Sequence, residues 1–181
     1  MTTATGEFPV IAVSDADVQV PKRRGRARGV RQMLTVETKP LIFGLTFSNG
    51  ERLRLEMTGC GQEPPGLWQL MAALQRLARL APSWDSYGAL PLNPGAVRRI
   101  FGFLDMLLFD VPLAPTVVPA RDGGLQLEWH RSDIDLEIKV PPVGPISHLL
   151  SDARTDLERE WQGPFDRHAV SEALTKIAQR E

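Results

Sequence analysis

Acidic side chains and a histidine alternate along two neighbouring strand-like segments in the second half of the chain. Glu128, His130, Asp135 and Glu137 occupy the polar positions of these segments, and a period of two places such residues on one face of a sheet. Carboxylates beside an imidazole can hold a divalent metal ion. The pattern therefore raises the hypothesis of a metal centre, against the simpler interpretation of a solvated sheet face, which we prefer.

A metal-dependent nuclease is a sharper hypothesis for the same region. Asp122, Glu137 and Lys139 fit the loose D…ExK spacing, with Glu128 as a further acid. In such enzymes the acids hold Mg²⁺ and the lysine positions or activates the attacking water. Alternating strands often produce Glu-x-Lys by chance, and Asp122 falls in a predicted turn rather than on a strand that faces the lysine. We keep the nuclease as an alternative.

Other catalytic and cofactor chemistry has little support in the sequence. Cys60, the only cysteine, has no evident base beside it, and we interpret it as a bystander thiol. His148 and His168 show no zinc-ligand spacing. The chain has no P-loop, no Gly-x-Gly-x-x-Gly and no Gly-x-Ser-x-Gly motif. We therefore expect no cofactor and no bound metal.

A cluster of positive charge lies near the N-terminus. Its six cations are Lys22, Arg23, Arg24, Arg26, Arg28 and Arg31. Such a cluster predicts salt-dependent binding of DNA or RNA, or contact with an acidic protein partner, although a solubilising tail explains it as well. The formal net charge of the chain is −1, so any electrostatic attraction of this kind belongs to the arm alone.

The Trp-Asp-Ser-Tyr-Gly-Ala segment at residues 84–89 lies between two predicted helices. Asp85 and Tyr87 would supply an acid and a hydroxyl if the segment formed the mouth of a pocket. On the structural interpretation, which we prefer, Trp84 anchors the loop in the core, Asp85 or Ser86 accepts hydrogen bonds from turn amides, and Gly88 adopts a conformation that other residues avoid. We expect substitution of Asp85 or Tyr87 to impair folding.

The N-terminal part is predicted to be a tail followed by strands. Residues 1–32 carry too little apolar surface to offset the entropy of ordering them, although residues 10–13 would suit a short docked strand. Strands are predicted over 34–37, 41–47 and 52–57. An Asn-Gly turn joins the last two into a hairpin, and the alternation of the return strand predicts one buried face.

Two helices and a three-stranded meander follow. The first helix is predicted over 67–78, and the second begins at Asn93, a good N-cap that precedes a proline. Strands are predicted over 116–119, 125–130 and 134–140, with apolar and polar residues alternating in the last two. The apolar face of this meander is suited to receive the two helices.

The C-terminal part is predicted to be a helical appendage. Prolines break the strand pattern after residue 140, and helices are predicted over 147–161 and 166–180. A narrow apolar stripe on the last helix is predicted to complete a partner's groove. This stripe consists of Val170, Leu174 and Ile177.

Two motifs carry a resemblance to a group of small bacterial and phage-associated proteins. The WDSYGA segment at 84–89 is followed by GGLQLEW at 123–129, and members of that group carry a WD(S/G)YGA element, a helix and then a GG(I/L)QLEW hairpin. The resemblance spans residues 80–140 and implies a shared fold, with no catalytic residue to transfer. It also suggests a place in a short mobile-element operon, like that of toxin–antitoxin pairs.

These observations predict an α+β protein in three parts. A basic tail at 1–32 precedes a domain at 33–141, in which the hairpin and the meander form an antiparallel sheet with two helices packed on one face, and 142–181 is the appendage. No apolar stretch is long enough to span a bilayer and the N-terminus does not resemble a signal peptide, so we expect a cytoplasmic protein without a membrane partner.

The leading hypothesis for function is a non-enzymatic interaction or regulatory protein, antitoxin-like, with a protein partner. Self-association remains open. The alternatives are the metal-dependent nuclease and nucleic-acid binding through residues 22–31.

Overall fold

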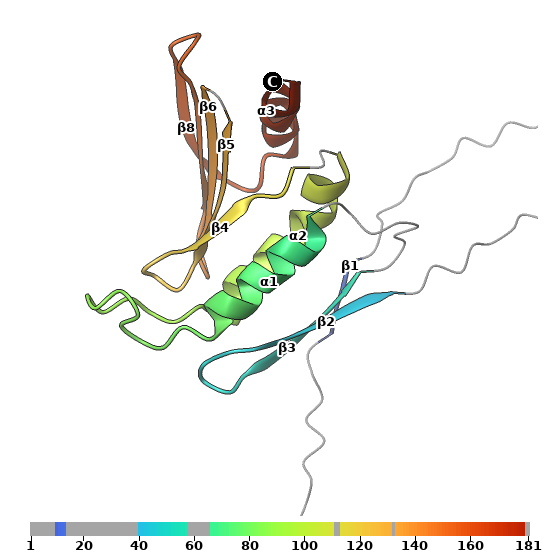
Figure 1. Cartoon of the computed structure of the whole chain (residues 1–181), viewed down its shortest axis with the longest axis vertical. Coiled ribbons are helices and arrows are strands. Elements are labelled where there is room, and N and C mark those ends of the chain that lie inside the picture. Colours follow the sequence, from blue (N-terminus) through green and yellow to red (C-terminus); the bar gives the residue numbers. More distant parts are fainter. Residues whose placement is uncertain (1–9, 14–39, 58–65, 111–112, 132, 180–181) are drawn as a thin grey trace, which may run out of the picture.

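The chain combines two β-sheets and three α-helices in the part that the structure, a computed structural model, describes (Figure 1). This part comprises residues 10–13, 40–57, 66–110, 113–131 and 133–179. The predicted α+β class is confirmed.

The smaller sheet has three strands in the order β1-β3-β2. Strands β2 (Leu41–Thr46) and β3 (Arg52–Met57) form the predicted hairpin. Its Asn-Gly turn is closed because Gly50 takes a φ of +84° and the Asn49 side chain accepts a hydrogen bond from the Glu51 backbone. Strand β1 (Val10–Val13) pairs in parallel with β3, so the short docked strand that the sequence allowed is present.

Two helices follow the hairpin at the predicted positions. Helix α1 spans Leu67–Ala78 and α2 spans Pro94–Asp110. The start of α2 is fixed by Asn93, whose Oδ1 accepts a hydrogen bond of 2.7 Å from the backbone N–H of Gly95. This is the geometry of an N-cap with proline at the first helical position.

The larger sheet is an antiparallel meander of five strands in chain order. Its strands are β4 (Thr116–Pro119), β5 (Leu125–Arg131), β6 (Ile134–Val140), β7 (Ile146–Asp152) and β8 (Leu157–Gly163). Buried and exposed positions alternate along β5, β6 and β7, so one face is apolar and the other polar.

Helix α3 (Arg167–Gln179) closes the described part of the chain. Asp166 caps it by accepting a hydrogen bond of 3.0 Å from the backbone N–H of Ala169. The helix packs against α2 and β6. The predicted helix at 166–180 is thus confirmed over Arg167–Gln179.

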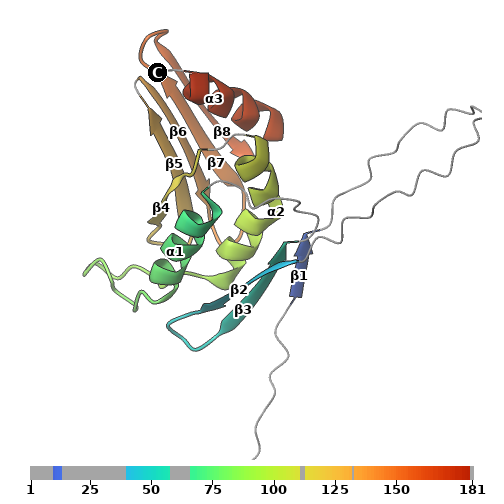
Figure 2. The same cartoon turned by 45° about the vertical axis from the view of Figure 1, so that its right-hand side comes forward.

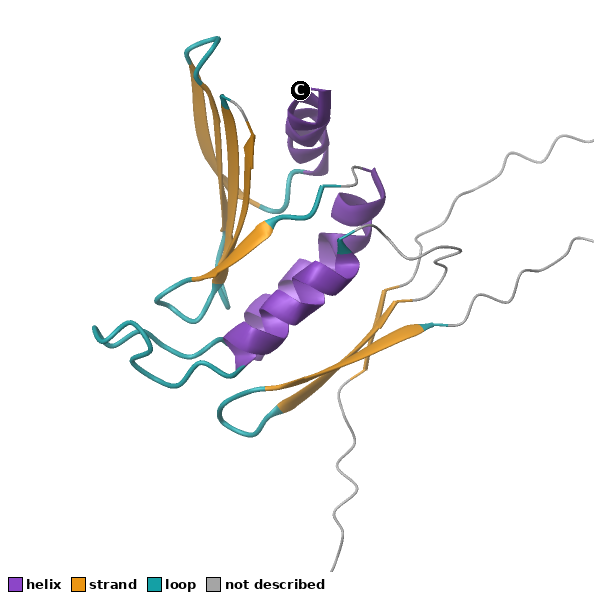
Figure 3. Ribbon diagram, viewed as in Figure 1, coloured by secondary structure: helices purple, strands orange, loops and turns teal. Residues whose placement is uncertain are grey.

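Helices α1 and α2 lie between the two sheets, as Figures 1 and 2 both show and the colouring of Figure 3 makes plain. Helix α1 contacts β2 and β4, whereas α2 contacts β1, β3 and β6. The architecture is therefore layered as sheet, helices, sheet. Fully buried residues of both sheets and both helices, among them Leu55, Leu74, Ile100 and Leu127, belong to one continuous hydrophobic core.

Two fold predictions are wrong. The hairpin and the meander belong to separate sheets, because seven of the twelve residues of α1 are buried and such a wide apolar arc packs against two layers. The segment 147–161, predicted to be a helix, forms most of β7 and β8. The run of charged residues Glu158, Arg159 and Glu160 is typical of an exposed edge strand, which β8 is.

Candidate functional site

The segment 84–89 forms a tight loop between α1 and α2, and Asp85 holds its backbone. The Asp85 Oδ1 accepts hydrogen bonds from the backbone N–H of Tyr87 at 2.8 Å and of Ala89 at 3.0 Å. Its Oδ2 lies 2.8 Å from Nε of Arg121. The Ala89 hydrogen bond above all, together with Tyr87 and Arg121, lowers the pKa of Asp85. Asp85 is therefore a fixed anion that organises the loop. The structural interpretation left Asp85 and Ser86 open as acceptors for the turn amides, and the structure assigns this role to Asp85.

The loop is closed by two further hydrogen bonds. The backbone N–H of Ser83 donates to the Ala89 carbonyl at 2.8 Å, and Nε1 of Trp84 donates to the Leu90 carbonyl at 3.1 Å. Trp84 is half-buried and lies outside the hydrophobic core. The expectation that it anchors the loop in the core is wrong, since its role is to bond the two ends of the loop together.

The loop is docked on the hairpin turn between β4 and β5. Arg121 donates through Nη2 to the Tyr87 carbonyl at 2.8 Å, and its own carbonyl accepts from the Leu90 backbone at 2.9 Å. The Asn93 backbone likewise donates to the Gly123 carbonyl at 2.9 Å. The first motif and the hairpin turn that leads into the second are therefore joined through the residues that flank the motifs, Leu90, Asn93 and Arg121. Sequence reasoning missed Arg121, because no local pattern marks a contact between residues 34 positions apart.

The same loop exposes two apolar side chains on a constrained backbone. Tyr87 is 82% exposed and Leu90 is 56% exposed. Ser83 and Ser86 both have a positive φ, at 61° and 64°, as does Gly88. A positive φ is unfavourable for serine, so surrounding contacts must hold these residues in place. The exposure of Tyr87 argues against the expectation that its substitution impairs folding, because little of its side chain is packed.

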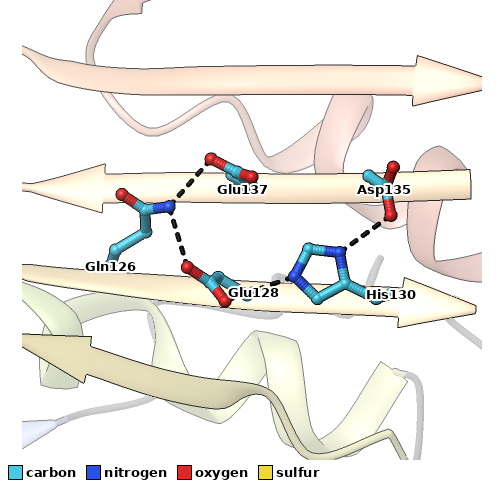
Figure 4. Close-up of polar contacts among 5 residues, drawn as sticks. All are labelled: Gln126, Glu128, His130, Asp135 and Glu137. Atoms are coloured by element: carbon cyan, nitrogen blue, oxygen red, sulfur yellow. Dashed lines mark hydrogen bonds and ion pairs between the residues drawn. The ribbon is translucent and has the colours of Figure 1, made fainter.

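The polar face of the large sheet carries the predicted cluster of acids and histidine (Figure 4). Nε2 of Gln126 donates to Glu128 at 2.9 Å and to Glu137 at 2.8 Å. His130 lies between two carboxylates, with Nδ1 at 2.8 Å from Asp135 and Nε2 at 3.2 Å from Glu128. The structure thus brings together all four residues that the alternation placed on one face, and links them through Gln126, which sequence reasoning did not single out.

The contacts of His130 favour its protonated form. The hydrogen bond to Asp135, followed by that to Glu128, raises its pKa. A protonated ring donates from both nitrogens, which matches one carboxylate at each nitrogen. In this state His130 has no lone pair with which to bind a metal or accept a proton. The protonated ring would be a positive charge between two acids.

The residues of the D…ExK hypothesis are divided between two separate contacts. Nζ of Lys139 lies 3.8 Å from Oδ2 of Asp122, so this turn aspartate does face the lysine, contrary to expectation. Asp122 also accepts a hydrogen bond from the Gly124 backbone at 2.9 Å, whereas Glu137 is bound to Gln126. Within the described residues, no group of three or more His, Cys, Asp or Glu side chains is placed to hold a metal ion.

His148 is a buried histidine on the opposite, apolar face of the large sheet. It is 1% exposed, and its ring stacks on Trp161 with 4.7 Å between centroids. Burial lowers its pKa, and the Trp161 backbone and the charge of Asp166 oppose this without cancelling it. His148 is therefore neutral and part of the core. The alternation of Ile146, His148 and Leu150 could have identified it from the sequence.

The C-terminal stripe is already covered by the chain itself. Val170, Leu174 and Ile177 are each 1% exposed or less and belong to the core. The prediction that they complete a partner's groove is wrong for this conformation. The reason is that α3 packs against α2 and β6, which cover the stripe within the same chain.

Three features of the sequence lie outside the described residues, namely the basic arm at 22–31, the strand predicted over 34–37 and Cys60. Within the described part, no helix is both long and apolar enough to cross a membrane.

Comparison with known proteins finds no family model that matches the chain, and no significant match among curated proteins or solved structures. The resemblance described above therefore remains a prediction that rests on its two motifs.

Proposed function

We propose that the protein is a non-enzymatic interaction protein that recognises a protein partner through the loop 83–90. The observation that carries this proposal is that Tyr87 and Leu90 are exposed on a backbone fixed by Asp85 and Arg121. Large apolar side chains on a rigid support favour binding, because little conformational entropy is lost when a partner covers them.

The composition and shape of the loop support this interpretation. Tyrosine is enriched among the residues that dominate binding energy at protein interfaces, and it combines a large apolar ring with a polar tip. The positive φ angles of Ser83 and Ser86 are backbone strain, which is typical of functional positions where a required shape outweighs its conformational penalty. The loop shape is thus maintained at some expense of folding stability. The Tyr87 side chain does not offset this, because it packs little against the fold.

The polar face of the large sheet supports a protein without catalysis more than it supports the nuclease. Its acids are bound to Gln126 and His130, and these contacts favour the protonated form of His130, which has no lone pair with which to act as a base. The nuclease hypothesis makes its own prediction, namely Mg²⁺- or Mn²⁺-dependent cleavage of DNA or RNA that disappears in Glu137→Ala. Such cleavage would overturn the proposal.

The resemblance to phage-associated proteins narrows the search for the partner. An antitoxin-like role would place the partner's gene beside the gene of this protein, so the products of the neighbouring genes are the first candidates to test.

The decisive experiment compares two variants at exposed apolar positions. Tyr87→Ala and Val143→Ala each truncate a side chain that is 82% exposed, but only Tyr87 lies on the loop. Tagged wild-type and variant chains are co-expressed with the neighbouring gene products, and the affinity for any retained product is then measured by calorimetry. Loss of an interfacial tyrosine typically weakens binding by about 2 kcal/mol, which is about 30-fold.

We expect the same product to bind wild-type and Val143→Ala chains alike, and to bind Tyr87→Ala at least tenfold more weakly. Equal binding by all three chains would move the interface elsewhere, and no binding by the wild type would refute the proposal. The far-ultraviolet circular dichroism of Tyr87→Ala should match that of the wild type, since the ring contributes little to folding.

A further inference from the structure

Strand β2 is an edge of the small sheet and lacks the features that usually protect an edge. Among the described residues, no strand pairs with its side opposite β3. It is six residues long, Leu41–Thr46, and contains no charge and no proline. Native proteins commonly protect edge strands with charges, prolines or short length.

The other edges of this molecule follow that rule. Strand β4 has four residues and ends in Pro119, and β8 carries Glu158, Arg159 and Glu160 on a mostly exposed strand. Strand β1 has only four residues. The contrast within one chain marks β2 as the edge suited to pair with another strand.

The pairing register shows which backbone groups of β2 face outwards. The Phe47 backbone N–H donates to Glu51 O at 2.9 Å, so Phe47 occupies a hydrogen-bonded position of the hairpin. In antiparallel pairs such positions alternate with non-bonded ones. Backbone groups of Leu45 and Phe43 therefore point to β3, and those of Ile42, Gly44 and Thr46 point to the unpaired side.

We propose that this edge pairs with the same edge of a second copy of the chain, in antiparallel orientation about a two-fold axis at Gly44. Residues 42, 44 and 46 each offer one donor and one acceptor, and the axis sets Gly44 opposite Gly44 and Ile42 opposite Thr46 of the second copy. This register satisfies every outward group of the three residues and forms about six hydrogen bonds. The outcome is a continuous six-stranded sheet across the dimer.

Gly44 and its surroundings favour such an approach. A Cβ built on Gly44 would meet no atom within 4 Å, so no packing among the residues that the structure describes explains why this position is glycine. Glycine within a strand is often found where another backbone approaches closely. Ile42 is 52% exposed on the same strand, and Trp68, which is 58% exposed, packs edge-on against Phe43. Both apolar side chains lie beside the proposed contact.

The charges of the small sheet permit self-pairing. Strand β2 brings no charged side chain to the contact, and the arginines of the hairpin, Arg52 and Arg54, lie on β3. In the dimer the two β3 strands would be three strand spacings apart, roughly 14 Å. This exceeds the screening length of about 8 Å at physiological ionic strength, so repulsion between the arginines does not prevent association.

The test measures the mass of the full chain in solution by analytical ultracentrifugation over a range of concentrations. We expect the wild type to reach twice the 20.1 kDa of one chain and no more, because a two-fold contact closes on itself. Gly44→Pro removes the N–H at the axis, which bonds to no described residue of the monomer, and proline is tolerated at an edge whose N–H faces solvent. It should be monomeric.

Ile42→Lys provides a second variant should Gly44→Pro fail to fold, and Val143→Lys is its matched control, since it places the same charge at an exposed valine away from the edge. We expect Ile42→Lys to dissociate at least tenfold more readily than the wild type and Val143→Lys to remain dimeric. A wild type that stays monomeric, variants that stay dimeric, or polymers that grow with concentration would each overturn the proposal.

A cross-link locates the axis directly. In a Cys60→Ser background, which removes the only native cysteine, Gly44→Cys should form a disulfide-linked dimer on oxidation, and Val143→Cys should not. Equal cross-linking of both variants would refute the register. Because Tyr87→Ala leaves β2 untouched, it should dimerise as the wild type does, so this inference and the proposed function can fail independently.

Discussion

The contact between the loop 83–90 and the hairpin turn can be tested by adding one methyl group at Gly123. This residue has a φ of +80°, and a Cβ there would lie 2.9 Å from the carbonyl oxygen of Pro91. The left-handed conformation disfavours alanine by about 1–2 kcal/mol. Relief of the close contact must also displace the Gly123 carbonyl, which accepts the Asn93 hydrogen bond, and we expect a further loss of about 1 kcal/mol.

Gly50→Ala is the matched control for this substitution. Gly50 has a nearly identical φ of +84°, but a Cβ at this position would meet no atom within 4 Å. The backbone penalty and the change in unfolded-state entropy are therefore shared by the two variants. The difference between them isolates the close approach of the hairpin turn to the loop.

Thermal and urea-induced unfolding, followed by circular dichroism, measure that difference. For a chain of this size about 1 kcal/mol corresponds to 2–4 °C in Tm, so Gly123→Ala should melt about 2–4 °C below Gly50→Ala. Hydrogen exchange should also become faster in the loop for Gly123→Ala only. Indistinguishable Tm values for the two variants would refute the reasoning, because the contact would then contribute nothing.

Three further predictions concern ionisable groups. Asp85→Asn should lower Tm and speed hydrogen exchange in the loop. Because the pKa of Asp85 is lowered in the folded state, the contribution of this carboxylate to stability should be present above pH 3.8 and lost as the pH falls through the folded-state pKa. His148 has a lowered pKa, so stability should fall as the pH drops below 6.5, and urea unfolding of His148→Phe should lack this component. The pKa of His130 is raised, so NMR titration of its ring should give a midpoint above pH 6.5, and Asp135→Asn should lower that midpoint. The contribution of the protonated His130 ring to stability should be lost as the pH rises through the midpoint.

The loop and the β2 edge suggest how an interaction protein of this size can be organised. The loop is attached to the large sheet through Arg121, and β2 belongs to the small sheet on the other side of the helices. Self-association at β2 would therefore leave Tyr87 free to meet a partner. Each copy in the dimer would carry one recognition loop.

The local sequence pattern was sufficient to predict the elements whose residues have strong short-range conformational preferences. The Asn-Gly turn, the Asn93 cap and the alternation of β5 and β6 all depend on short-range preferences, and each was predicted at its observed position. The joint placement of Glu128, His130, Asp135 and Glu137 followed from the same alternation. Strands β7 and β8 were missed because a buried histidine interrupts the apolar positions of β7, and β8, an exposed edge strand, lacks a regular alternation of buried and exposed residues.

What the sequence by itself determined is thus the α+β class, most element positions and the expectation that Asp85 or Ser86 accepts hydrogen bonds from turn amides, between which the structure selects Asp85. Only the tertiary structure decided that the hairpin forms a second sheet, that α3 covers its own apolar stripe, and that Arg121 joins the loop to the hairpin. The periodicity of apolar residues shows which face of an element is apolar, but it does not show which other element that face packs against. Contacts between distant residues therefore had to come from packing.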